Sequence, residues 1–145
     1  MYANPYASGT SLETQVLSAT PTELIGLLFD AAVKTVVEAR RHLAEGKIPE
    51  RGRAVTKTVE IMAELSRSLN HTEGGELSAR LAGVYDYVAR RVMEANFEQT
   101  DGGLAEAERL LRTVQEGWTS AMAGLTAAAS AAPVAGYAGA HQWSA

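Results

Sequence analysis

The chain has 145 residues, of which 46% are hydrophobic and 21% are charged, and these proportions are typical of one globular domain with a modest core. The formal net charge of −4 argues against nucleic-acid binding, because phosphate contacts need a concentrated positive field. There is no cysteine, which excludes disulfides and permits a reducing cytoplasm. From Gly117 to Ala145 no residue is charged, but Ala, Gly and Ser dominate there, so we expect no membrane insertion.

Residues 1–19 are mostly small and polar, and Tyr6 is one of their few large side chains. They contain no basic stretch followed by an apolar one, so we expect no signal peptide. Leu12, Val16 and Ala19 have the spacing of a short amphipathic helix. Two interpretations stay open for this segment: a frayed terminus, or a movable arm that docks through its tyrosine.

A first long helix is predicted from Pro21 to about Glu45. Thr20 is a favourable N-cap, Glu23 completes a capping box, and Pro21 suits the first helical position. Gly46 is expected to end the helix. The residues expected on its inner face are Leu24, Leu27, Leu28, Ala31, Ala32, Thr35, Ala39 and Leu43.

Three more helices are predicted, at about residues 49–69, 76–98 and 104–125. Each carries apolar residues spaced by three and four positions, which is the pattern of one buried helix face. Loops at 70–75 and 100–103, each with a glycine pair, separate them. The last helix has the most regular pattern, formed by Leu104, Ala107, Leu111, Val114, Trp118, Ala121 and Leu125.

Helices joined by short loops pack antiparallel to their chain neighbours, so the sequence predicts an all-α, up-down four-helix bundle. We expect the bundle to span residues 20–125, preceded by an N-terminal arm or short helix at 1–19. Residues 126–145 are rich in Ala and Gly and have few anchors, which favours a disordered C-terminal tail.

The stretch Leu81–Phe97 adds a polar cluster that a simple core helix does not need. Tyr85 and Tyr87 lie two positions apart and cannot both face one core, so at least one is expected on a groove or against the arm. Arg91 is either a solvated arginine paired within its helix or a fork for carboxylate or backbone oxygens of a partner. An apolar stripe is predicted along this stretch, formed by Leu81, Val84, Tyr85, Val88, Val92 and Ala95. Asn96, at the end of this stripe, is expected to bond backbone groups there.

The histidines do not fit a metal-containing bundle. Di-iron bundles need Glu-x-x-His pairs, and no glutamate lies three residues before His42, His71 or His141. Histidine is also too scarce for a nucleophile with an adjacent base, and no phosphate-binding loop is present. We therefore expect no enzyme activity, no catalytic residue, no metal site and no cofactor.

The order and spacing of several motifs resemble the FliS family of flagellar secretion chaperones, over about residues 4–122. The strongest match is Val84-Tyr85-Asp86-Tyr87 followed by Arg90-Arg91-Val92-x-Glu94-Ala95-Asn96. The other matches are Asn4-Pro5-Tyr6, Ala19-Thr20-Pro21-x-Glu23-Leu24, Leu28-Phe29-Asp30, Leu65 to Asn70 and Leu104 through Trp118.

The resemblance implies a cytoplasmic chaperone that works without ATP and binds the disordered C-terminal segment of flagellin. In such proteins that segment folds partly into helices in apolar grooves, which prevents premature polymerisation and keeps flagellin competent for type III secretion. The family's N-terminal arm can occupy part of the same surface. Other flagellar export or regulatory proteins are further expected partners, nucleic acid and membrane are not, and a monomer or weak homodimer is expected.

The resemblance also implies a set of partner-binding residues. Tyr6 would anchor the arm, and Arg91 and Asn96 would contact a partner. The residues expected in or beneath the grooves are Leu28, Phe29, Met62, Leu65, Tyr85 and Tyr87. The alternative is a structural helical adaptor that self-associates through its seams and has no unfolded client. A metal-bundle enzyme is a third class, and the chain lacks the ligands for it.

Overall fold

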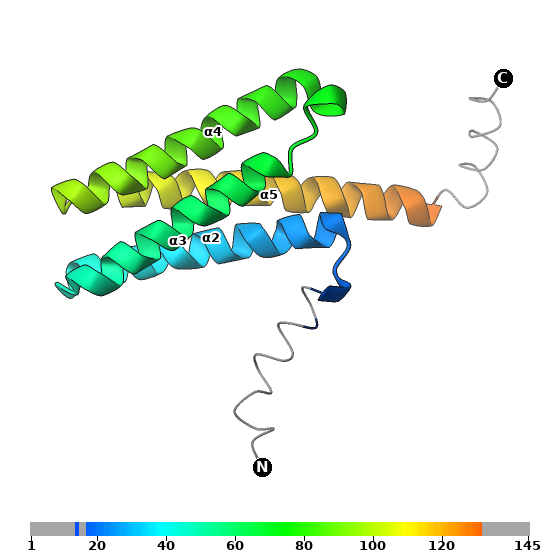
Figure 1. Cartoon of the computed structure of the whole chain (residues 1–145). Coiled ribbons are helices and arrows are strands. Elements are labelled where there is room, and N and C mark those ends of the chain that lie inside the picture. The colour runs from blue at the N-terminus through cyan, green and yellow to red at the C-terminus, as the bar shows by residue number, and fades with distance from the viewer. Residues whose placement is uncertain (1–13, 15–16, 132–145) are drawn as a thin grey trace, which may run out of the picture.

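The computed structural model describes residue 14 and residues 17–131. Its long helices are α2 (Pro21–Ala44), α3 (Ile48–Arg67), α4 (His71–Glu98) and α5 (Gly102–Ala131) (Figure 1). Both α2 and α4 pack against α3 and against α5, so the four helices close into a ring. The described residues contain no strand, and the predicted all-α four-helix bundle is confirmed. Across these residues, every helix is too short or too polar to cross a bilayer.

The predicted start and end of α2 are confirmed. The Thr20 hydroxyl accepts from the backbone N–H of Glu23 at 3.1 Å, and the Glu23 carboxylate accepts from the backbone N–H of Thr20 at 2.9 Å. These two bonds satisfy N–H groups that have no partner within the helix. After α2, Gly46 takes a φ of 69°, a left-handed conformation that glycine adopts without steric cost.

The predicted loop at 70–75 is wrong in its first part, because α4 already begins at His71. The Asn70 side chain accepts from Glu73 N–H at 3.1 Å and caps this first turn. The helix is then interrupted at Gly75, which has a φ of 50° and a ψ of −121°. Helical geometry resumes after Gly75, where the prediction placed the start of the helix. The polar residues 70–73 beside a glycine pair were interpreted as a loop, so the extra helical turn that begins at His71 was not predicted.

The core face of α2 agrees only in part with the predicted one. Ala32, Thr35 and Ala39 are buried as predicted, whereas Phe29, Val33 and Val36 are buried although they were not on the predicted face. The hydroxyl oxygens of Thr35 on α2 and Thr58 on α3 lie 2.6 Å apart, so both polar groups are bonded inside the core. The fully buried large side chains are Phe29, Met62, Leu65, Leu104, Leu111, Val36, Val88 and Val92.

Helix α5 continues to Ala131 instead of ending at Leu125, so the beginning of the predicted tail is helical. Alanine dominates this extension, and alanine has the highest helix propensity of all residues. Most of the predicted arm (1–13 and 15–16, including Tyr6) and the tail from 132 to 145 lie outside the described residues.

Candidate functional site

A large apolar groove lies at the end of the bundle where α2 and α4 begin. It has a volume of about 1070 Å³, and all four helices contribute to its lining. We call it the apical groove. Its apolar lining residues are Pro21, Leu24, Ile25, Leu28, Phe29, Leu69, Leu77, Leu81, Tyr85, Val114, Gly117, Trp118 and Ala121.

Three aromatic rings from three helices form the floor of the apical groove. The Phe29 ring centroid lies 6.3 Å from that of Tyr85 on α4 and 6.2 Å from that of Trp118 on α5. Both pairs are tilted, with interplanar angles of 59° and 48°, which is a favourable arrangement for aromatic rings. Burial raises the pKa of the Tyr85 phenol, because a low-dielectric surrounding disfavours its charged form.

The walls above this floor are apolar but only partly covered. Leu77 on α4 is 63% exposed although it lines the groove, and Leu28 and Leu81 are half-buried. Beneath them Phe29 is 1% exposed and Leu65 is 0% exposed, so the core is already closed. The groove therefore presents more apolar surface than the fold needs, and such a surface is typical of an interaction site.

The rim of the groove on α3 is polar. Arg67 forms an exposed ion pair with Glu64, one turn apart on α3, and both residues belong to the groove lining. Thr22, Ser68 and Asn70 add neutral polar groups. An apolar centre with a hydrated polar rim is the usual composition of a protein-binding site.

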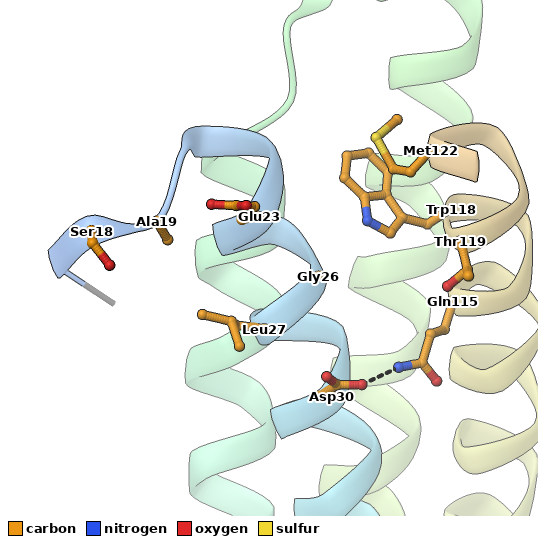
Figure 2. A pocket seen from close by; sticks show the side chains of 10 residues that line it. All are labelled: Ser18, Ala19, Glu23, Gly26, Leu27, Asp30, Gln115, Trp118, Thr119 and Met122. Atoms are coloured by element: carbon orange, nitrogen blue, oxygen red, sulfur yellow. Dashed lines mark hydrogen bonds between the residues drawn. The ribbon is translucent and has the colours of Figure 1, made fainter. Parts of the chain in front are cut away.

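A smaller cleft of about 560 Å³ lies between the start of α2 and α5 (Figure 2). Trp118 and Met122 project into it from α5, opposite Glu23 and Gly26 of α2. The Gln115 amide donates to Asp30 and joins the two helices beside the cleft. Because Trp118 also lines the apical groove, its indole ring separates the two hollows.

The other half of the bundle is held by polar contacts between α4 and α5. Tyr87 donates to both carboxylate oxygens of Glu106 at 2.9 Å, and the Arg91 guanidinium donates to the same carboxylate at 2.7 Å and to Glu94 at 3.2 Å. The hydrogen bonds from Arg91 and then Tyr87 lower the pKa of Glu106 below its ordinary value. Bonding to Glu106 raises the pKa of Tyr87. Tyr87 and Arg91, which were predicted to bind a partner, thus join α4 to α5.

A second polar contact joins α3 to the end of α4. Arg51 is only 4% exposed and donates to the Asn96 side-chain oxygen at 2.7 Å and to the Asn96 carbonyl at 3.2 Å. The last turn of α4 has no basic residue of its own, so Arg51 supplies the positive charge that a helix C-terminus favours. The predicted bonding of Asn96 to backbone groups is not what the structure shows, because its side chain accepts from Arg51.

A third contact joins α2 to α5. Arg40 donates to both carboxylate oxygens of Asp101 at 2.8 Å and to Glu108 at 2.8 Å. These hydrogen bonds raise the pKa of Arg40. Burial acts to raise the pKa of Glu108, but the bonds from Arg40 and Arg112 outweigh it, so the pKa is lowered overall. Arg40 therefore clamps the C-terminal half of α2 to the first turns of α5.

The predicted partner-binding residues divide into three groups. Three of them, Leu28, Phe29 and Tyr85, line the apical groove. Met62 and Leu65 are buried and can only support a binding surface from below. The remaining described residues of the set, Tyr87, Arg91 and Asn96, are not part of the groove lining.

Several groove residues were predicted as core or not singled out. Trp118 was interpreted as core and does pack against it, but it is half-buried and also lines both hollows. Leu77 lies outside the predicted stripe and was missed. A usable signal was present at the start of α2, where five of the six residues from Leu24 to Phe29 are apolar. That run is wider than one buried helix face and indicates an additional apolar surface.

Among the described residues, no three or more Asp, Glu or His side chains are placed to hold a metal ion.

Comparison with known proteins identifies the relatives of this chain. The family model described as "Flagellar protein FliS" matches residues 2–125. The chain is 37% identical over 109 residues to the flagellar secretion chaperone FliS of Salmonella typhimurium, covering 74% of this chain and 81% of that protein. It is 35% identical over 108 residues to the flagellar secretion chaperone FliSB of Pseudomonas aeruginosa, covering 74% of this chain and 86% of that protein. The Bacillus subtilis FliS is 30% identical over 119 residues, covering 82% and 86%.

Proposed function

The chain belongs to the FliS family of flagellar secretion chaperones, and from that premise we propose that its client is flagellin. Its role is that of a chaperone in flagellar export and not that of an enzyme. The client segment we propose is the disordered C-terminal part of flagellin, which would fold into the apical groove as an amphipathic helix.

The observation that carries this proposal is the exposed apolar lining above a closed core. Leu77, Leu28 and Leu81 offer an apolar surface that an amphipathic helix can cover, and the aromatic floor under them is already packed. Recognition of this kind uses anchors spaced by three and four residues along the bound helix. A disordered client loses conformational entropy when it folds, so its affinity depends on burying a large apolar area.

We propose that this binding takes place in the cytoplasm and keeps flagellin from polymerising before export. A bound groove would cover apolar side chains of the client that otherwise pair with other flagellin molecules. Reversible cover of this type suits a client that is handed on to a secretion system.

Calorimetric titration of the full chain with the C-terminal flagellin segment of the same organism tests the proposal. We expect saturable 1:1 binding with a negative heat-capacity change, because apolar surface is buried. Leu77→Glu should weaken binding at least about tenfold, since a carboxylate would be transferred into an apolar interface. The matched control is Leu125→Glu, because Leu125 is equally exposed at 63% but does not line the groove, and its affinity should stay within about twofold.

The outcomes separate the client-binding chaperone from the alternative. A well-folded protein that gives no heat and does not comigrate with the segment on a sizing column would contradict the proposal. If the same protein instead formed concentration-dependent oligomers that Leu77→Glu abolished, the groove would be a self-association surface and the helical adaptor would replace the chaperone interpretation.

A further inference from the structure

We propose that the C-terminal segment 132–145 of this chain docks into its own apical groove when no client is bound. The segment would enter over the α5 wall of the groove and anchor there through Trp143, with Tyr137 near the entrance. The occupant is thus part of the same polypeptide, and the effect on client affinity is the only part of the inference that rests on the proposed function.

The position of α5 supports this inference first. Helix α5 supplies Val114, Gly117, Trp118 and Ala121 to the groove wall and then continues to Ala131. Its end lies at the same end of the bundle as the start of α2 (Figure 1). The segment that follows Ala131 therefore begins at the end of the bundle that carries the groove and not at the opposite end of the molecule.

The reach of the segment supports it next. At 1.5 Å per residue, Ala131 is about 26 Å along α5 from Val114, the first α5 residue of the groove wall. An extended chain spans at most about 3.3 Å per residue, which gives about 20 Å from Ala131 to Tyr137 and about 40 Å from Ala131 to Trp143. Trp143 can therefore reach the whole α5 wall with chain to spare, whereas Tyr137 reaches only its nearer part.

The local sequence favours a reversal of direction after α5. Pro133 cannot continue a helix and disfavours helical geometry in the residue before it. Gly136 and Gly139 allow turn conformations that other residues rarely adopt. A chain that follows α5 with this sequence can thus fold back along the helix within a few residues.

The chemistry of the segment matches the groove. No residue from Gly117 onward is Asp, Glu, Lys or Arg, so docking would bury no formal side-chain charge. Its two large aromatic side chains would meet a floor made of Phe29, Tyr85 and Trp118. Aromatic pairs contribute beyond the area they bury, and the alanine and glycine residues at 138–140 have no side-chain entropy to lose on ordering.

The consequence for client binding follows from tethering. A short tether holds the segment at an effective concentration in the millimolar range. The segment can bind the groove weakly and still occupy it. If its dissociation constant lies between one tenth of that effective concentration and the concentration itself, the segment is bound in at least half of the molecules. Deletion of 132–145 should therefore strengthen client binding about two- to tenfold, because the client no longer competes with the segment.

The docking itself is tested without any client. The chain has two tryptophans, so full-length protein labelled with 5-fluorotryptophan gives two fluorine NMR signals, and Trp143→Phe assigns them. We would measure how strongly a soluble gadolinium chelate relaxes the Trp143 signal, with the isolated 132–145 peptide as the exposed reference. We expect at least about twofold weaker relaxation in the intact chain than in the peptide, unchanged on tenfold dilution. Leu77→Glu should restore the relaxation seen in the peptide and Leu125→Glu should not.

Each other result overturns the inference. Equal relaxation in the intact chain and the peptide would mean that Trp143 does not dock. Protection that survives Leu77→Glu would place the segment elsewhere, and protection lost on dilution would mean docking into a second copy. Protection that appears only after residues 1–13 are deleted would make the N-terminal segment the occupant. Because this measurement uses no flagellin, its failure is distinguishable from failure of the proposed function.

Discussion

The two ends of this bundle are built differently. Where α2 and α4 end, charged and polar contacts join α2 to α5, α3 to α4 and α4 to α5, through Arg40, Arg51 and Arg91. Where α2 and α4 begin, the helices meet around apolar side chains and leave a groove of about 1070 Å³. One end fixes the arrangement of the helices, and the other end can therefore expose apolar surface without losing the fold.

A glycine marks the point from which α4 and α5 separate. A side chain on Gly103 would place its Cβ 2.8 Å from the Arg91 carbonyl oxygen and 3.1 Å from the Ala95 Cβ. The two helices are thus in close backbone contact at this point, and they diverge toward the opposite end of the bundle (Figure 1). The groove opens where this divergence leaves room between them.

The largest expected effect compares one leucine from each end. We call the end where α2 and α4 end the closed end. Leu104 is 0% exposed there, and Leu104→Ala should lower the free energy of unfolding by about 2–5 kcal/mol through lost burial and a cavity. Leu77 lines the groove and is 63% exposed, and Leu77→Ala should change the free energy of unfolding by no more than about 0.5 kcal/mol. Urea unfolding of both variants checks this difference. Similar losses in the two variants would mean that the groove wall is part of the core.

The next effect uses the two neighbouring glycines at the start of α5. Gly103→Ala should destabilise the protein by about 1–3 kcal/mol, because the backbone of α4 must move to admit the methyl group. Gly102→Ala meets nothing within 4 Å and should stabilise it by up to about 1 kcal/mol, because alanine favours the helix. Opposite signs in urea unfolding support the close contact, and a neutral or stabilising Gly103→Ala would refute it.

The smallest effect concerns pH and the polar contacts of the closed end. Glu106 has a pKa below its ordinary value of 4.5, first because of Arg91 and then because of Tyr87. A carboxyl whose pKa is lowered in the folded state adds stability above its ordinary pKa, and this contribution is lost as the pH falls below about 4.5. We expect the urea concentration at the unfolding midpoint to decrease as the pH is lowered below about 4.5. The decrease should be less steep in Glu106→Gln.

The matched control for this pH series is Glu60→Gln on the exposed surface of α3. Its unfolding should follow the wild-type pH dependence. A Glu106→Gln profile that is indistinguishable from that of Glu60→Gln would show that the bonds to Arg91 and Tyr87 do not stabilise the closed end.

The sequence was sufficient for the number and order of the helices, because these depend on local signals. The capping residues Thr20 and Glu23 placed the start of α2, and Gly46 placed its end. Apolar spacing of three and four identified the buried faces of α3 and α4 and the buried first half of α5, but Ala121 and Leu125, predicted on the same face of α5, are exposed. It identified only half of the buried residues of α2, because that helix is apolar on more than one side and periodicity alone does not choose between them.

The site could be predicted only in part, because its residues come together through helix register. Arg40 bonds residues that lie 61 and 68 positions later in the chain, and no local pattern contains that pairing. The sequence allowed the Arg91 guanidinium to bind oxygen atoms of a partner, but in the fold it donates to Glu106 and Glu94. Phe29 and Tyr85 of the floor were predicted as groove residues and Trp118 only as core, and their assembly into one groove depends on how the helices pack.

Hydrogen exchange of the full chain, with and without the C-terminal flagellin segment, tests the central claim most directly. Backbone amides report where a bound client slows local opening. We predict that slowing is concentrated where the groove walls lie, around residues 24–29 of α2, 77–85 of α4 and 114–121 of α5. Amides of the closed end, around Arg51 and Asn96, should change little. Slowing confined to the closed end, or spread evenly over both ends, would contradict the assignment of the apical groove as the client-binding site.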